Sequence, residues 1–124
     1  MSIKLIALAD LEEYSEEDLF KHLINYYTAP HNIRDLYSIL VAYESVGDYG
    51  CDSNSYFLFK DKKTNELYEL CGSHCSCYGF EDQFDLSKTN LDYLKSNRFY
   101  IATGGYDDDA QKNVSKIKTF LQEL

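Results

Sequence analysis

The spacing of apolar and polar positions along the chain predicts two long helices. Apolar residues recur every three or four positions between Leu19 and Tyr27, which is typical of a helix buried on one side over 16–27. Ser15 and Asp18, three positions apart, match a capping box at its start, and Pro30 ends the pattern. A second stripe near the C-terminus follows three aspartates that suit a helix N-terminus: Ala110, Val114, Ile117, Leu121 and Leu124.

The middle of the chain is rich in β-forming residues instead. Residues 36–43, 55–60 and 66–71 predict three strands joined by short polar loops, which indicates an antiparallel meander. Residues 2–9 suit a strand or the first turns of a helix, and 98–103 is a further candidate strand. Thr89, with Asp92 three positions on, predicts the start of a short helix through Ser96.

These elements predict an α+β fold, in which about three helices pack on an antiparallel meander sheet of three to four strands. The chain has 124 residues, a single proline and no linker-like stretch, so we expect one domain over 1–124. We expect Tyr27, Tyr37, Tyr43 and Tyr68 to face the core, and His22 to lie at the boundary between the core and solvent.

The charge balance narrows the class of partner. Lys and Arg number 12 against 21 Asp and Glu, a formal net charge of -9. Such an excess repels nucleic acid and anionic lipid, so direct binding to either is not expected. The sequence has no apolar run long enough to cross a bilayer and no signal-peptide pattern, which favours a cytoplasmic location.

The carboxylates allow two interpretations. In one they form a solvated, soluble surface. This surface would include the carboxylates, among them Glu44 and Glu69, that lie in two stretches of the chain without Lys or Arg. In the other they form a field that recognises a basic partner, with tyrosines in Gly-containing loops as contacts. The candidate partner-binding residues are Glu12, Glu13, Glu16, Glu17, Asp18, Tyr49, Tyr78, Phe80, Glu81, Asp82 and Asp85.

Cysteine and histidine are concentrated in one short segment. Cys71, His74, Cys75 and Cys77 are residue types that bind zinc, and Cys51 could add a fourth thiol. The spacing differs from that of zinc knuckles, because His74 and Cys75 are adjacent. Packed thiols, a zinc site and a cysteine nucleophile activated by a histidine all stay open, and no cofactor other than zinc is indicated.

The segment from Gly72 to Phe84 resembles one found in small uncharacterised proteins of bacteriophages and prophages. The resemblance takes in the preceding hairpin and covers residues 37–95, around a Ser-His-Cys-Ser-Cys-Tyr-Gly core. Phe80 and Phe84 stand where such proteins usually carry Leu and Trp, and 86–88 is less acidic than in them. The resemblance implies a small phage accessory protein that acts in a host cytoplasm, and no activity.

These observations together lead to one functional hypothesis and two alternatives. The hypothesis is a non-enzymatic phage-type inhibitor, similar in size and charge to anti-CRISPR proteins. Its acidic, tyrosine-bearing surface would bind a basic site on a host defence protein, such as a nuclease or a CRISPR effector. The alternatives are a phage zinc or thiol protein built on the Cys/His segment, and a homodimeric assembly factor that pairs through its last helix.

Overall fold

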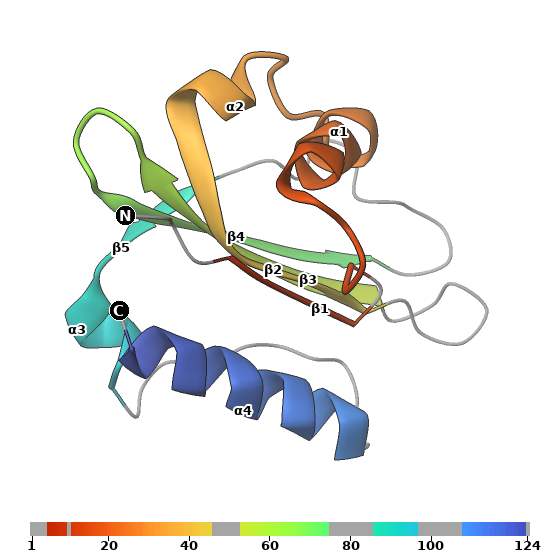
Figure 1. Ribbon diagram of the computed structural model, residues 1–124, viewed down its shortest axis with the longest axis vertical. Coiled ribbons are helices and arrows are strands. Elements are labelled where there is room, and N and C mark those ends of the chain that lie inside the picture. Colours follow the sequence, from red (N-terminus) through yellow and green to blue (C-terminus); the bar gives the residue numbers. More distant parts are fainter. Residues whose placement is uncertain (1–4, 10, 46–52, 75–85, 97–107, 124) are drawn as a thin grey trace.

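The protein forms one five-stranded sheet with helices on both faces, as the computed structural model shows (Figure 1). The structure describes residues 5–9, 11–45, 53–74, 86–96 and 108–123. The α+β class is confirmed. The elements in chain order are β1 (Ile6–Ala9), α1 (Glu16–Tyr27), α2 (Ile33–Leu36), β2 (Tyr37–Ser45), β3 (Ser53–Asp61), β4 (Leu67–His74), β5 (Ser87–Thr89), α3 (Leu91–Leu94) and α4 (Asp108–Gln122).

The strands lie in the order β1-β2-β3-β4-β5. The predicted antiparallel meander is confirmed as β2, β3 and β4, and β5 extends it by pairing Ser87 with Glu69. The segment that suited either a strand or a helix is β1, and it runs parallel to β2 with Ile6 opposite Val41. Parallel neighbours need a long crossover connection, and here α1 and α2 provide it. The sheet is therefore larger than the expected three to four strands and is not purely antiparallel.

Each face of the sheet has its own apolar core. Successive side chains of a strand point to opposite faces, so Phe57 and Phe59 of β3 pack under α1 with Leu19 and Leu23, whereas Leu58 faces α4. On the α4 side, Val114 is half-buried and Ile117 and Leu121 are buried, as the helical stripe predicts. Figure 1 shows α1 and α2 over one face and α4 over the other. Ala110 and Leu124, at the ends of the predicted stripe, lie outside the described side chains.

The helix ends follow local capping rules. The predicted capping box is present, since the Asp18 backbone N–H donates to Ser15 Oγ (3.2 Å) and the Ser15 N–H donates to Asp18 Oδ2 (3.5 Å). The predicted cap of the short helix is off by one residue. Thr89 belongs to β5, and Asn90 Oδ1 accepts from the Tyr93 N–H (2.9 Å) instead.

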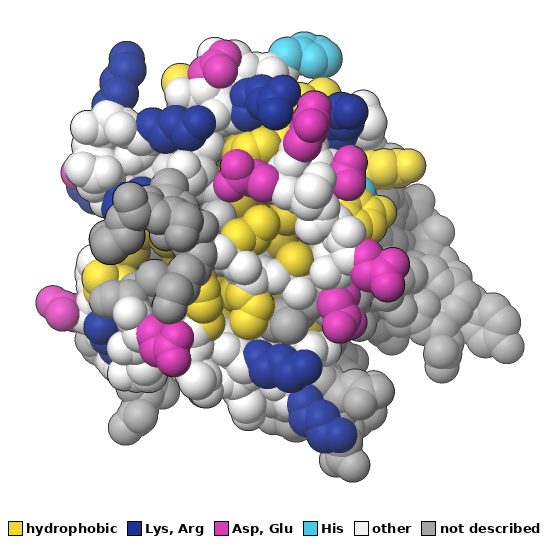
Figure 2. Space-filling view, viewed as in Figure 1, with side chains coloured by type: hydrophobic (Ala, Val, Ile, Leu, Met, Phe, Trp, Pro, Cys, Tyr) yellow, Lys and Arg dark blue, Asp and Glu magenta, His cyan; other side chains and the backbone are white. Residues whose placement is uncertain are grey.

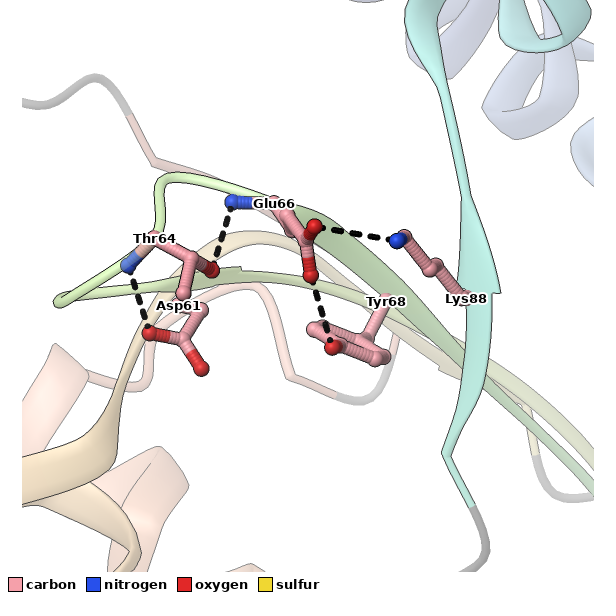
Figure 3. Close-up of polar contacts among 5 residues, drawn as sticks. All are labelled: Asp61, Thr64, Glu66, Tyr68 and Lys88. Carbon is pink, nitrogen blue, oxygen red and sulfur yellow. Dashed lines mark hydrogen bonds and ion pairs between the residues drawn. The ribbon is translucent and has the colours of Figure 1, made fainter.

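A polar network at the β3–β4 turn ties three strands together (Figure 3). Asp61 Oδ1 accepts from the backbone N–H groups of Lys63 (2.7 Å) and Thr64 (3.0 Å), and these bonds lower the pKa of the Asp61 carboxyl. Glu66 accepts from Lys88 Nζ of β5 (2.9 Å) and from the Tyr68 hydroxyl (3.1 Å), which lowers the pKa of Glu66.

The expected core tyrosines divide into two groups. Tyr27 and Tyr43 are buried, whereas Tyr37 and Tyr68 are half-buried and pack their rings edge to face at 5.8 Å. The candidate strand over 98–103 lies outside the described residues. Among the described helices, none is long and apolar enough to cross a bilayer.

Candidate functional site

The first candidate surface is the acidic segment that leads into α1. The side chains of Glu12, Glu13, Glu16, Glu17 and Asp18 are all exposed. They gather there because the helix begins at Glu16, where its positive dipole end favours carboxylates, and because the turn at 11–13 places two more just before it. Lys21 Nζ and Arg34 Nη1 each lie 3.9 Å from Glu17 Oε1, at long and exposed ion-pair distances that neutralise little of this charge. The acidic segment therefore keeps a net negative charge.

Outside the acidic segment, the described residues carry carboxylates and basic side chains side by side, and several further carboxylates of the chain lie outside the described residues. Acidic and basic side chains are nearly equal in number among the described residues, and Figure 2 shows them intermingled on one face. The acidic segment is thus distinct from its surroundings by local density of carboxylates.

A stripe along α1 lies beside the acidic segment. Tyr14, Asp18, His22 and Tyr26 are spaced four residues apart, which places them on one side of the helix and the turn before it. The His22 ring contacts Tyr14 edge on, with ring centroids 5.7 Å apart, and Tyr26 at 4.9 Å. Together with Lys21 and Asn25 they line an open groove of about 300 Å³, which we call the α1 groove.

A buried carboxylate lies behind this groove. Glu44 of β2 is only 6% exposed, and its Oε1 lies 2.9 Å from His22 Nε2 and 2.6 Å from the Tyr27 hydroxyl. The expectation that Glu44 is solvated is therefore wrong. The alternation of β2 turns this side chain toward α1, where an imidazole and a phenol supply the donors that a buried carboxylate needs. His22 lies at the core boundary, as the sequence predicts, with 12% of its side chain exposed.

The buried Glu44 carboxylate changes the pKa of Tyr27 and lies beside a second buried polar residue, Ser55. Burial of Tyr27, together with the charge and hydrogen bond of Glu44, raises the pKa of the Tyr27 phenol far above its ordinary value. Ser55 of β3 lies opposite Glu44 in the β2–β3 register and is 3% exposed. Its Oγ makes no hydrogen bond of good geometry in the described structure, although the nearby Ser55 hydroxyl opposes the other causes and acts to lower the pKa of Tyr27.

A smaller polar cluster lies on the α4 face. The Tyr56 hydroxyl donates to Glu69 Oε2 (2.8 Å), and Glu69 is half-buried, so it is less solvated than expected. Burial and the Glu69 charge raise the pKa of Tyr56. Cys71, two residues along β4, is a free thiol on an exposed residue; partial desolvation of the sulfur and the Glu69 charge raise the pKa of this thiol.

The structure leaves the predicted metal site and loop contacts untested. Cys71 lies on β4 and His74 ends that strand, with no description of its side chain. Among the described residues, no group of three His, Cys, Asp or Glu side chains could hold a metal ion. The remaining predicted site residues lie outside the described residues: Cys75, Cys77, Tyr49, Tyr78, Phe80, Glu81, Asp82 and Asp85.

Sequence reasoning identified the acidic segment but missed the groove next to it. The available signal was the four-residue spacing from Tyr14 to Tyr26, which runs beside the apolar stripe of the same helix. No comparable signal marked Glu44, because its environment is created by a strand and a helix that lie far apart in the sequence. Comparison with known protein families, with curated proteins and with solved structures gives no match to this chain.

Proposed function

We propose that this protein is a non-enzymatic binding protein that presents the acidic segment, Glu12–Asp18, to a basic surface of a partner protein. A dense set of exposed carboxylates steers a basic partner during diffusion and aligns it on contact. In the phage setting that the sequence resemblance implies, the partner is a host protein that handles nucleic acid, and the carboxylates occupy a site that normally takes phosphates.

The observation that carries this proposal is the coincidence of charge and exposed aromatic rings. Among the described residues, the large apolar side chains left exposed are Tyr14 (39%), Tyr26 (59%) and Leu36 (37%). Tyr14 lies within the acidic segment and Tyr26 lies two helical turns after it, and both line the α1 groove. Exposed tyrosines surrounded by charge are typical of the anchors of protein interfaces.

The structure also changes which carboxylates should be altered in a test. Asp18 completes the capping box and Glu17 is the residue with basic neighbours, so changing them also perturbs α1. Glu12, Glu13 and Glu16 carry no such contact among the described residues. The informative variant therefore combines Glu12→Lys, Glu13→Lys and Glu16→Lys.

The test compares this variant with a matched one of the same net charge. Asp35→Lys, Asp92→Lys and Glu123→Lys reverse three exposed carboxylates elsewhere. Proteins captured from bacterial host lysate by the parent and the matched variant, but not by the acidic-segment variant, are the expected partners. With a purified partner, the association rate should fall about ten-fold or more at low salt.

Two results would overturn the proposal. One is that both triple variants capture the same proteins as the parent chain. The other is an association rate with the purified partner that does not change between low and high salt, because a steering field is screened by added ions.

A further inference from the structure

The α1 groove combines hydrogen-bond acceptors with aromatic rings. Its lining is Tyr14, Asp18, Lys21, His22, Asn25 and Tyr26. The Asp18 carboxylate uses Oδ2 in the capping box, and Oδ1 makes no hydrogen bond within the described structure. One turn later, the His22 ring contacts the rings of both Tyr14 and Tyr26.

The buried glutamate determines which His22 nitrogen can act in the groove. A carboxylate in its ionised form only accepts hydrogen bonds, so in that form Glu44 Oε1 takes the hydrogen of His22 Nε2 across 2.9 Å. In a neutral imidazole this assignment leaves Nδ1 as an acceptor. Nδ1 has no partner within the described structure, and the ring that carries it lines the groove. Asp18 Oδ1 is thus one acceptor at the groove, and the neutral form of His22 adds Nδ1 as a second acceptor on a residue one helical turn later.

We propose that the α1 groove binds the guanidinium group of an arginine side chain, with Asp18 and His22 as acceptors and Tyr26 as the stacking surface. A guanidinium is planar, carries only donors and stacks on aromatic rings, and these properties match the lining. The adjacent Glu12, Glu13 and Glu16 add a field that favours a cation. This inference rests on the proposed function and names the chemical group of the basic partner that the surface recognises.

Lys21 is the one lining residue whose charge opposes this ligand. Its side chain is 66% exposed, and its ammonium lies 3.9 Å from Glu17 Oε1. It therefore extends along the rim into solvent, where its repulsion of a bound cation is weakened. Replacement of Lys21 by Gln should strengthen binding, which is an effect that a purely structural role of the groove would not produce.

The test is an NMR titration of the intact protein with Nα-acetyl-arginine methylamide. The lysine and citrulline analogues serve as comparison probes, because one keeps the charge without the planar donor array and the other keeps the shape without the charge. The arginine probe should bind more tightly than the lysine probe, and citrulline should not bind. Long-range spectra of the His22 imidazole should show a shift at Nδ1, as an acceptor of a new hydrogen bond.

Variants then assign the contacts. Tyr26→Ala and Asp18→Asn should each weaken binding of the arginine probe about three-fold, whereas Lys21→Gln should tighten it. Asp35→Asn, an exposed carboxylate of α2, is the matched control and should bind like the parent. Because Tyr26 is 59% exposed, its replacement leaves the core intact and keeps the test valid if Asp18→Asn weakens the helix.

Equal affinity for the three probes, or an unchanged His22 Nδ1 signal at saturation, would overturn the inference. If the acidic-segment variant loses its partner but arginine leaves His22 unmoved, the groove inference fails and the proposed function stands. If arginine binds as described and the acidic-segment variant keeps every partner, the proposed function fails and the groove remains a guanidinium site.

Discussion

The hydrogen bond between Tyr27 and Glu44 allows a sharp test of the buried network. The Tyr27→Phe variant keeps the ring in its edge-to-face contact with Phe57 (5.5 Å) and removes only the hydroxyl that donates to Glu44 Oε1 across 2.6 Å. A hydrogen bond to a charged acceptor contributes about 1.5–3 kcal/mol. We therefore expect the free energy of unfolding to fall by roughly 2 kcal/mol at pH 8.

The stability difference between Tyr27→Phe and the parent should disappear at alkaline pH. The pKa of Tyr27 is raised in the folded protein, so its contribution is complete below the ordinary tyrosine pKa of about 10 and is lost as the pH rises above it. Above that pH the unfolded chain releases a proton that the folded chain keeps, which costs about 1.4 kcal/mol per pH unit for each such tyrosine. The parent and Tyr27→Phe should therefore reach equal stability near pH 11.5, roughly one and a half units above this threshold.

Urea unfolding followed by circular dichroism at half-unit steps from pH 8 to pH 11.5 measures both effects. Tyr56, whose hydroxyl donates to Glu69, contributes a slope of the same sign in both proteins and cancels in the difference. Tyr26→Phe removes an exposed hydroxyl and serves as the control at pH 8, where its stability should match the parent within about 0.5 kcal/mol. A difference between the parent and Tyr27→Phe that stays constant up to pH 11.5 would refute the reasoning.

Three further predictions concern single polar groups. Ser15→Ala removes the side-chain acceptor of the α1 capping box and should lower the free energy of unfolding by about 1 kcal/mol in urea titrations, whereas Ser15→Asp, a good cap, should retain most of it. Ser55→Ala removes a buried hydroxyl without a described hydrogen-bond partner, so the free energy of unfolding should stay unchanged or rise by about 1 kcal/mol in thermal unfolding. A clear loss of stability would show that the Ser55 hydroxyl makes a hydrogen bond in the folded protein. The turn hydrogen bonds lower the pKa of Asp61, so the ionised carboxylate stabilises the folded protein above about pH 4 and this contribution is lost on acidification. Asp61→Ala should therefore be less stable than the parent at pH 6. Between pH 5 and pH 2.5 the variant should lose less stability than the parent does.

The sequence alone determined the parts of the fold that depend on local rules. The α1 helix, its capping box and the β2–β4 meander follow from periodicity, turn residues and cap chemistry within a few positions of one another. The acidic segment was equally readable, because a helix N-terminus and a short turn keep consecutive carboxylates exposed. Carboxylates that are close together in the sequence stay close together in space when they lie in one turn and the first turn of the helix that follows it.

Only the tertiary structure decided which carboxylates are buried or half-buried, as Glu44 and Glu69 are. Glu44 and Glu69 looked alike in sequence to the exposed carboxylates, yet each accepts a hydrogen bond from a buried tyrosine on opposite faces of the sheet. The parallel pairing of β1 likewise depends on a crossover that no local pattern encodes. The contact behind the α1 groove has the same origin, because Glu44 of β2 reaches His22 of α1 from a distant part of the sequence. A side chain is buried by residues that can be far away in the sequence, and only the tertiary structure brings those residues together.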